Sequence, residues 1–212
     1  MKKISFFLIL IFNILYTCAY SDENFQIWLN EFKLVAVKSG VSQNTVNSVM
    51  DDAIFLPKVI KYDRYQPEFY EDTFTYIKKR TNTKKVKKGL ALYKKEKLII
   101  DKIDSKFLIE KELLLALMGI ETNFGNYLGK MDIVSSLATL SYDQRRSEFF
   151  TKELITLLKL VDAKIIDPST LFGSWAGAFG NFQFMPSTIS NYAIDYDSNS
   201  ELSLIHISEP TR

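Results

Sequence analysis

Apolar and polar positions alternate along this chain with the period of an α-helix. Helices are predicted over residues 25–38, 42–50, 69–79, 84–103, 113–120, 133–140 and 147–162, and a further one begins at Pro186. Ser42 and Ser147 are expected to be N-caps, and Asn82 is expected to open the helix that follows it. Residues 55–69 carry two prolines and are expected to be irregular or to form a short helix. No apolar run has the strand pattern needed for a sizeable sheet. The sequence therefore predicts a mainly α fold.

The most unusual stretch is the apolar helix over residues 113–120, which is followed at once by Glu121. Its apolar spacing predicts a buried helix, and Gly125 is placed to end it in the left-handed conformation. Burial would keep a carboxyl there in its protonated form, which general acid catalysis requires. The alternative is that Glu121 is a solvated charge on the last turn.

The N-terminus has the pattern of a secretory signal peptide, over residues 1–19. Lys2 and Lys3 precede an apolar run, and small residues follow it around Thr17 and Ala19. We therefore expect export to the periplasm. The single cysteine, Cys18, lies at the cleavage region, where it could carry a lipid anchor and make the chain an outer-membrane lipoprotein. Membrane association is expected only in that case.

The C-terminal residues 202–212 have an unexpected sequence. They correspond, codon for codon in one frame, to the translation of a transposase sequencing adapter. We interpret them as read-through that is not native, and the native part, residues 22–201, as truncated. The sole histidine, His206, lies in this segment, so the native part offers no histidine for catalysis or metal binding.

Charge argues against a nucleic-acid partner. The formal net charge is +2. Removing Lys2 and Lys3 with the signal, and Glu209 and Arg212 with the adapter, brings it to about zero. The lysine-rich stretch over residues 78–88 is read as a solvated helix face, although phosphate contacts are the alternative.

Two loops carry further candidate chemistry. Residues 173–180 interleave glycine with aromatic residues but lack the spacing of a phosphate-binding loop, so a loop lining a cleft fits better. Asp195, Asp197 and Asn199 place oxygen ligands at alternate positions, as in the first half of a calcium loop. Ser200 stands where such loops have glycine, and an Asx-rich surface turn is the alternative.

Taken together, these segments resemble the lytic murein transglycosylase B family, over roughly residues 25–201. The resemblance is carried by residues 59–69, 119–125, 137–150, 173–180 and 183–187. It implies a lysozyme-like helical catalytic domain with an N-terminal helical lobe at about 22–104 and a core at about 105–201, incomplete at its C-terminus. Departures are a phenylalanine, Phe149 or Phe150, where some members have tyrosine, and the absence of the family's cleft-closing C-terminal part.

The resemblance also implies an activity and its residues. The chain is expected to be a peptidoglycan lytic transglycosylase, a lyase that cleaves the MurNAc-β-1,4-GlcNAc bond and leaves 1,6-anhydro-MurNAc. Glu121 would be the single catalytic acid and then base, with Ser174 beside it in the cleft. Substrate binding is expected at Tyr76, Arg145, Arg146, Gln183 and Phe184.

The remaining expectations concern cofactors and partners. Ca²⁺ is expected at Asp195, Asp197 and Asn199, and the chemistry itself requires no cofactor. The partners are peptidoglycan glycan strands, with no nucleic acid, and the chain is expected to be a monomer. The alternatives are a non-catalytic peptidoglycan-binding or scaffold protein and, within the class, a hydrolytic muramidase.

Overall fold

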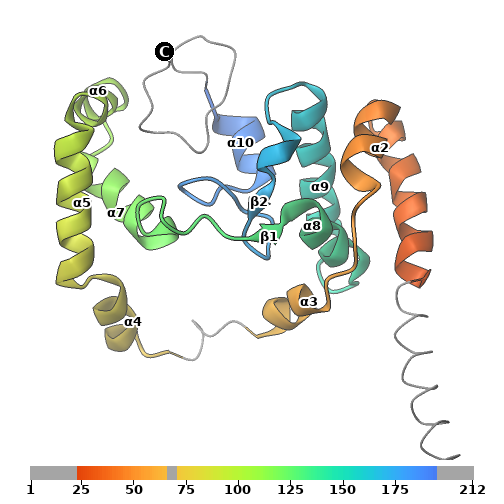
Figure 1. Cartoon of the computed structure of the whole chain (residues 1–212), viewed down its shortest axis with the longest axis horizontal. Helices are drawn as coiled ribbons and strands as arrows, with labels where there is room; N and C mark the ends of the chain where they lie inside the picture. The colour runs from red at the N-terminus through yellow and green to blue at the C-terminus, as the bar shows by residue number, and fades with distance from the viewer. Residues whose placement is uncertain (1–22, 66–70, 195–212) are drawn as a thin grey trace, which may run out of the picture.

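The structure, a computed structural model, describes residues 23–65 and 71–194 (Figure 1). A helix over residues 23–38 comes first. It is followed by α2 (Gln43–Met50), α3 (Pro57–Arg64), α4 (Thr73–Arg80), α5 (Thr83–Lys95), α6 (Lys97–Phe107), α7 (Lys111–Thr122), β1 (Met131–Asp132), α8 (Ile133–Tyr142), α9 (Ser147–Asp162), a 3-10 turn (Pro168–Thr170), β2 (Phe172–Gly173) and α10 (Pro186–Tyr192). The predicted mainly α fold is confirmed.

The core is built around α8, in which every residue from Ile133 to Ser141 is buried. The longer helix α9 packs along it, while α3 also contacts α8, and α2 and α10 contact α9. The interface between these helices is filled by large apolar side chains such as Leu137, Phe150 and Leu157. Burial of such side chains is the main driving force for this part of the fold.

A second group of helices, α5, α6 and α7, lies toward the other end of the molecule (Figure 1). These three helices contact one another but bury little, since Ile100 is the only buried residue of α6 and Gly89 the only one of α5. Helix α4 has no buried residue. Helix α7 contacts both α5 and α6. Since Glu121 lies in the last turn of α7, these contacts help to set the position of this candidate acid.

Short polar side chains start several helices as the sequence predicts. Ser42 and Asn82 accept hydrogen bonds from the backbone N–H groups three residues further on, and Asp72 and Asp132 do the same. These contacts satisfy N–H groups that would otherwise lack partners in the first turn. Helix α3 begins at Pro57 and α10 at Pro186, where a missing N–H carries no cost.

Two helix predictions were wrong in detail. Residues 84–103 form two helices, because the backbone leaves the helical conformation at Glu96, where φ is −107° and ψ is 24°. After the break α6 remains in contact with α5 and also contacts α7. Ser147 is not the N-cap of α9: Arg146 occupies that position, and the Ser147 hydroxyl donates to the carbonyl of Ser141.

Candidate active site

Glu121 lies in the last turn of α7 and is exposed. The expectation of a buried helix was therefore wrong for this side of α7. Leu117 and Ile120 are each 44% exposed, and only Met118, Gly119 and Thr122 of the helix are buried. The reason is that α5 and α6 cover one side of α7, so the opposite side, with Glu121, lies on the surface. The carboxyl is open to a ligand.

The backbone after Glu121 leaves the helix two residues before Gly125. Asn123 is the C-cap, with φ 52°, Phe124 follows at φ 61° and Gly125 at φ 74°. Gly125 therefore has the predicted left-handed conformation, two residues beyond the cap. Two successive non-glycine residues in this region are unusual and cost conformational energy. The amide of Asn126 bonds the carbonyls of Asn123 and Phe124 and so secures the turn.

Phe124 explains two glycines on neighbouring helices. Its ring lies against Gly119 of α7 and Gly89 of α5. A Cβ atom added at Gly119 would come within 2.7 Å of the ring's Cζ, and one at Gly89 within 3.0 Å. Both distances are shorter than ordinary van der Waals contact, so glycine gives the ring its space. The ring thereby joins α5, α7 and the turn after Glu121.

Thr122 ties this turn to the glycine-rich loop. It is fully buried, and its hydroxyl donates to the backbone carbonyl of Asn181 at 2.8 Å while accepting from the N–H of Gly125 at 3.0 Å. Glu121 is the preceding residue, so one buried hydrogen-bonded side chain sets where the carboxyl lies relative to residues 173–184. We did not predict Thr122 as a site residue, since a threonine in a helix carries no signal of its own.

The glycine-rich loop starts from the small sheet. Strands β1 and β2 are antiparallel, with Met131 opposite Gly173. Gly129 approaches Gly173 so closely that a Cβ atom at position 129 would lie 2.0 Å from the carbonyl oxygen of Gly173. This close approach of two backbones brings the chain that follows α7 next to the start of the loop.

Ser174 lies directly after β2, where it closes its own turn. Its backbone N–H donates to the carbonyl of Ala178, and its hydroxyl accepts from the N–H of Ala178 at 3.0 Å. Within residues 23–65 and 71–194 no hydrogen bond joins Ser174 to Glu121. The described hydrogen bond of the Ser174 hydroxyl is thus the one that it accepts within its own turn.

Gln183 and Phe184 lie at the end of the same loop. Gln183 has a left-handed backbone, with φ 51°, and its amide donates to the carbonyls of Leu128 and Gly180. Phe184 is exposed and stacks on Phe182, with ring centroids 5.8 Å apart. Gln183 thus links the loop to the segment after α7, and Phe184 offers an aromatic surface of the kind that binds sugars.

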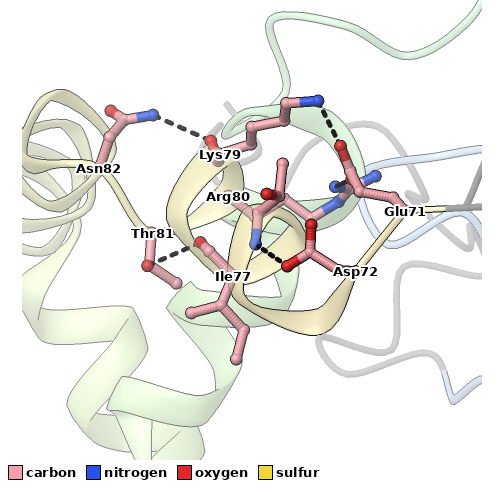
Figure 2. Close-up of polar contacts among 8 residues, drawn as sticks. Glu71, Asp72, Ile77, Lys79, Arg80, Thr81 and Asn82 are labelled. Carbon is pink, nitrogen blue, oxygen red and sulfur yellow. Dashed lines mark hydrogen bonds and ion pairs between the residues drawn. The ribbon is translucent and has the colours of Figure 1, made fainter.

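Tyr76 belongs to α4. Figure 2 shows the charged residues Glu71, Lys79 and Arg80 of the same region. The guanidinium of Arg80 lies 3.6 Å from the centroid of the Tyr76 ring and also pairs with Glu71. Lys79 bonds the other oxygen of Glu71, and this hydrogen bond is the main reason why the pKa of Glu71 is held below its ordinary value of 4.5. Asp72 caps the helix, as Figure 2 shows. The Tyr76 side chain remains partly exposed beside Arg80.

Arg145 and Arg146 both bind one buried carboxylate, that of Asp63 in α3. Asp63 is only 2% exposed, whereas the two arginine side chains are half-exposed. The sequence did not single out Asp63. An aspartate near a helix end is common, and the partner arginines lie about eighty positions away in the chain.

The predicted calcium ligands Asp195, Asp197 and Asn199 lie outside the described residues. In the part of the chain that the structure describes, no three His, Cys, Asp or Glu residues gather as a metal site would require. None of the described helices is long and apolar enough to span a membrane.

Comparison with known proteins adds sequence and structural relatives. Membrane-bound lytic murein transglycosylase B of Escherichia coli is 34% identical over 130 residues, which are 61% of this chain and 36% of that protein. SltB3 from Pseudomonas aeruginosa, solved in complex with NAG-NAM-pentapeptide, matches with a TM-score of 0.81 and 30% identity over 85% of this chain and 48% of that one.

Escherichia coli SLT35, solved in complex with bulgecin A, matches with a TM-score of 0.72 and 29% identity over 86% of this chain and 58% of that one. A calcium complex of the same protein matches with a TM-score of 0.71. The chain thus spans between about a third and three fifths of the length of these relatives. The model of the transglycosylase SLT domain family matches residues 24–209, and the chain belongs to this family.

Proposed function

We propose that this protein is a peptidoglycan lytic transglycosylase that cleaves the β-1,4 bond between N-acetylmuramic acid and N-acetylglucosamine. The observation that carries the proposal is the family match over residues 24–209. Within this range Glu121 lies in the last turn of α7, next to Thr122, which binds the carbonyl of Asn181 after the glycine-rich loop. A fold match at TM-score 0.81 to a protein solved with NAG-NAM-pentapeptide supports the same class of substrate.

Glu121 acts twice in the proposed reaction. As an acid it protonates the glycosidic oxygen while the N-acetyl oxygen of the muramic acid attacks C1, so the bond to the leaving sugar breaks. As a carboxylate it then takes the proton of the C6 hydroxyl of the same sugar. That oxygen attacks C1, releases the N-acetyl group and closes the 1,6-anhydro ring. One carboxylate suffices because the substrate supplies the nucleophile, whereas most glycosidases need two.

Glu121 is exposed in the protein without a ligand. In the proposed reaction the bound glycan covers its carboxyl. A bound sugar chain expels water from the carboxyl and strengthens its interactions with the reacting atoms. We propose that Tyr76, Phe184 and Gln183 contact the glycan, and that Ser174 orients the acetamido group or the carboxyl of Glu121. Arg145 and Arg146 are proposed to meet the acidic part of the substrate.

The test is product analysis by mass spectrometry after incubation of purified peptidoglycan with the protein. The anhydro sugar is expected, and reducing-end muramic acid instead would identify a hydrolytic muramidase. Glu121→Gln should lower turnover by about 10²- to 10⁴-fold, the usual contribution of a general acid. If the wild type forms no product and Glu121→Gln binds the glycan as well as the wild type does, the alternative of a binding or scaffold protein is favoured.

We also propose that Asp195, Asp197 and Asn199 contribute oxygen ligands to a Ca²⁺ site, which suits a hard cation. SLT35 has been solved in complex with calcium. Added Ca²⁺ should raise the unfolding temperature of the protein, since a ligand bound only to the folded state stabilises it. Asp195→Ala should abolish the increase, and Mg²⁺ should not reproduce it. An equal increase in the variant would contradict the assignment.

Export is proposed from the predicted signal peptide over residues 1–19. Mass spectrometry of the protein made in a Gram-negative host should show a mature chain that starts just after this segment. Labelling with a radioactive fatty acid decides whether Cys18 carries a lipid. A lipid-free mature chain that remains in the soluble periplasmic fraction would exclude the lipoprotein.

A further inference from the structure

The carboxylate of Asp63 is the meeting point of two arginines. Its Oδ2 lies 2.9 Å from Nε of Arg145, and its Oδ1 accepts from Nη2 of Arg146. Arg145 also donates from Nη2 to the backbone carbonyl of Asp63, at 2.9 Å. Each carboxylate oxygen is therefore bound by a different arginine. The helix α3 is joined in this way to the turn between α8 and α9.

This arrangement is a costly way to stabilise a fold. Asp63 lies in the last turn of α3, where the helix dipole disfavours a negative charge, and its side chain is 1% exposed. Buried charges lose hydration that ion pairing returns only in part, so a buried ion pair is a weak source of stability. A function that needs the two arginines in fixed positions explains the buried charge of Asp63 better than a gain in stability does.

The cluster carries one more positive than negative charge. Two guanidinium groups share the single carboxylate, while the neighbouring pair Arg64 and Asp143, at 2.7 Å, is balanced in itself. The side chains of Arg145 and Arg146 are 49% and 39% exposed, and the guanidinium of Arg146 also lies 4.9 Å from the ring centroid of Phe150. Of the described contacts of these arginines, none uses an Nη1 group.

We propose that Asp63 is a positioning residue that holds Arg145 and Arg146 as a fixed receptor for a carboxylate on the peptide-bearing glycan strand. The inference rests on the proposed function, because it takes the substrate from there. Asp63 itself does not touch the ligand. It removes the freedom of two long side chains before binding, so the ligand does not bear that entropy cost. The planar guanidinium groups then present outward N–H donors suited to a carboxylate.

The experiment compares two ligands: NAG-NAM-pentapeptide with free carboxylates and the same molecule with those carboxylates amidated. Calorimetry should show that the wild type prefers the charged ligand. Asp63→Asn should weaken binding of the charged ligand by about ten-fold, and leave the amidated ligand within two-fold. Raising the salt concentration should shrink the preference of the wild type but change the variant little.

Asp143→Asn is the matched control, because it makes the same change in the balanced pair of Arg64 and Asp143, which joins α3 to the end of α8. It should leave both affinities unchanged. A folded Asp63→Asn protein that keeps the wild-type preference, or that weakens both ligands equally, would overturn the proposal and leave Asp63 a purely structural role.

Should Asp63→Asn fail to fold, Arg145→Lys and Arg146→Lys decide the question. Lysine keeps the charge but cannot span the contacts that Arg145 makes, so these variants should lose the same preference, and retention of it would also overturn the proposal. Because the readout is binding, it separates the two hypotheses. A chain that binds through the arginines yet forms no anhydro sugar contradicts the proposed function only.

Discussion

At the scale of single residues, the side chains that matter most around Glu121 are its neighbours. Thr122 is buried and joins the end of α7 to the loop over residues 173–184 through the carbonyl of Asn181. Phe124 occupies the space left by Gly89 and Gly119. The carboxyl itself is exposed, so its position depends on these backbone and ring contacts rather than on contacts of its own.

Thr122→Val tests the first of these contacts. It keeps the shape of the side chain but removes the hydroxyl, which leaves the carbonyl of Asn181 and the N–H of Gly125 without this partner. We expect a loss of about 1–3 kcal/mol in the free energy of unfolding, measured with urea. Turnover should fall by more than the fraction of protein that the lower stability leaves unfolded. Thr122→Ser should restore most of the turnover and most of the stability. Full activity in Thr122→Val would show that this bond does not position Glu121.

Gly119→Ala tests the contact with the ring. The added Cβ would meet Cζ of Phe124 at 2.7 Å, so the ring has to shift away from α7. We expect destabilisation of about 1–3 kcal/mol in urea unfolding, as for other overpacked interiors. Phe124→Leu in the same background should recover part of it by removing the clash. A stability gain in Gly119→Ala alone, as from the higher helix propensity of alanine, would contradict this reading.

The candidate acid could be predicted from the sequence, but its surroundings could not. Glu121 follows an apolar run and precedes a glycine, and this local pattern is visible in the letters. Whether Leu117 and Ile120 are covered depends on which other helices reach α7, which the local pattern does not contain. Asp63 was missed for the same reason, because its partners are distant in sequence.

At the scale of elements, helices are held together by carboxylates that bind hydroxyl and amide groups. Asp162 at the end of α9 accepts from the hydroxyls of Ser42 and Thr45 and from the backbone of Ser42, and so fixes the start of α2. Glu153 of α9 is buried and accepts from the backbone and the hydroxyl of Ser187 near the start of α10. Both contacts place an acid at a helix N-terminus, where the dipole favours it.

Asp162→Asn should loosen α2 from α9. The hydroxyl of Ser42 loses a charged acceptor, and hydrogen exchange of the α2 amides should become faster while that of α8 stays slow. Asp51→Asn is the control, since Asp51 pairs only with Lys33 at the exposed end of α2. Equal exchange rates in both variants would show that Asp162 does not hold the helix.

Local sequence signals predicted where the helices begin and end far better than they predicted which helix faces are buried. Caps at Ser42 and Asn82 and the start of α10 at Pro186 were predicted because they depend on a few adjacent residues. The division at Glu96 was missed, since the stretch has no glycine or proline there and the break serves the contact of α6 with α5.

At the scale of the whole molecule, acid should destabilise the fold. The pKa values of Asp162, Asp72 and Asp167 are held below their ordinary value of 3.8 by hydrogen bonds, first among them those from Ser42, Thr75 and Ser169. Those of Glu148 and Asp101 are lowered chiefly by hydrogen bonds from Lys152 and Lys97. A carboxylate with a lowered folded-state pKa stabilises the protein above its unfolded pKa, and this contribution is lost as the pH falls through the folded value.

The urea midpoint should therefore be nearly constant above about pH 5 and fall steadily below pH 4.5. Sodium chloride at 0.5 M should reduce the part that comes from the lysine pairs, because salt screens exposed charges. The part that comes from hydroxyl and amide donors should persist. A midpoint that rises on acidification would contradict the direction of these pKa shifts.

The close approach of the backbones at Gly129 and Gly173 has a consequence for engineering the protein. The backbones at Gly129 and Gly173 leave no room for a methyl group at position 129, so any larger residue there forces the two segments apart. Libraries that randomise this pair should return glycine at 129 almost without exception. Diversity intended to change the proposed contacts with the glycan belongs instead at Phe184, whose side chain is exposed.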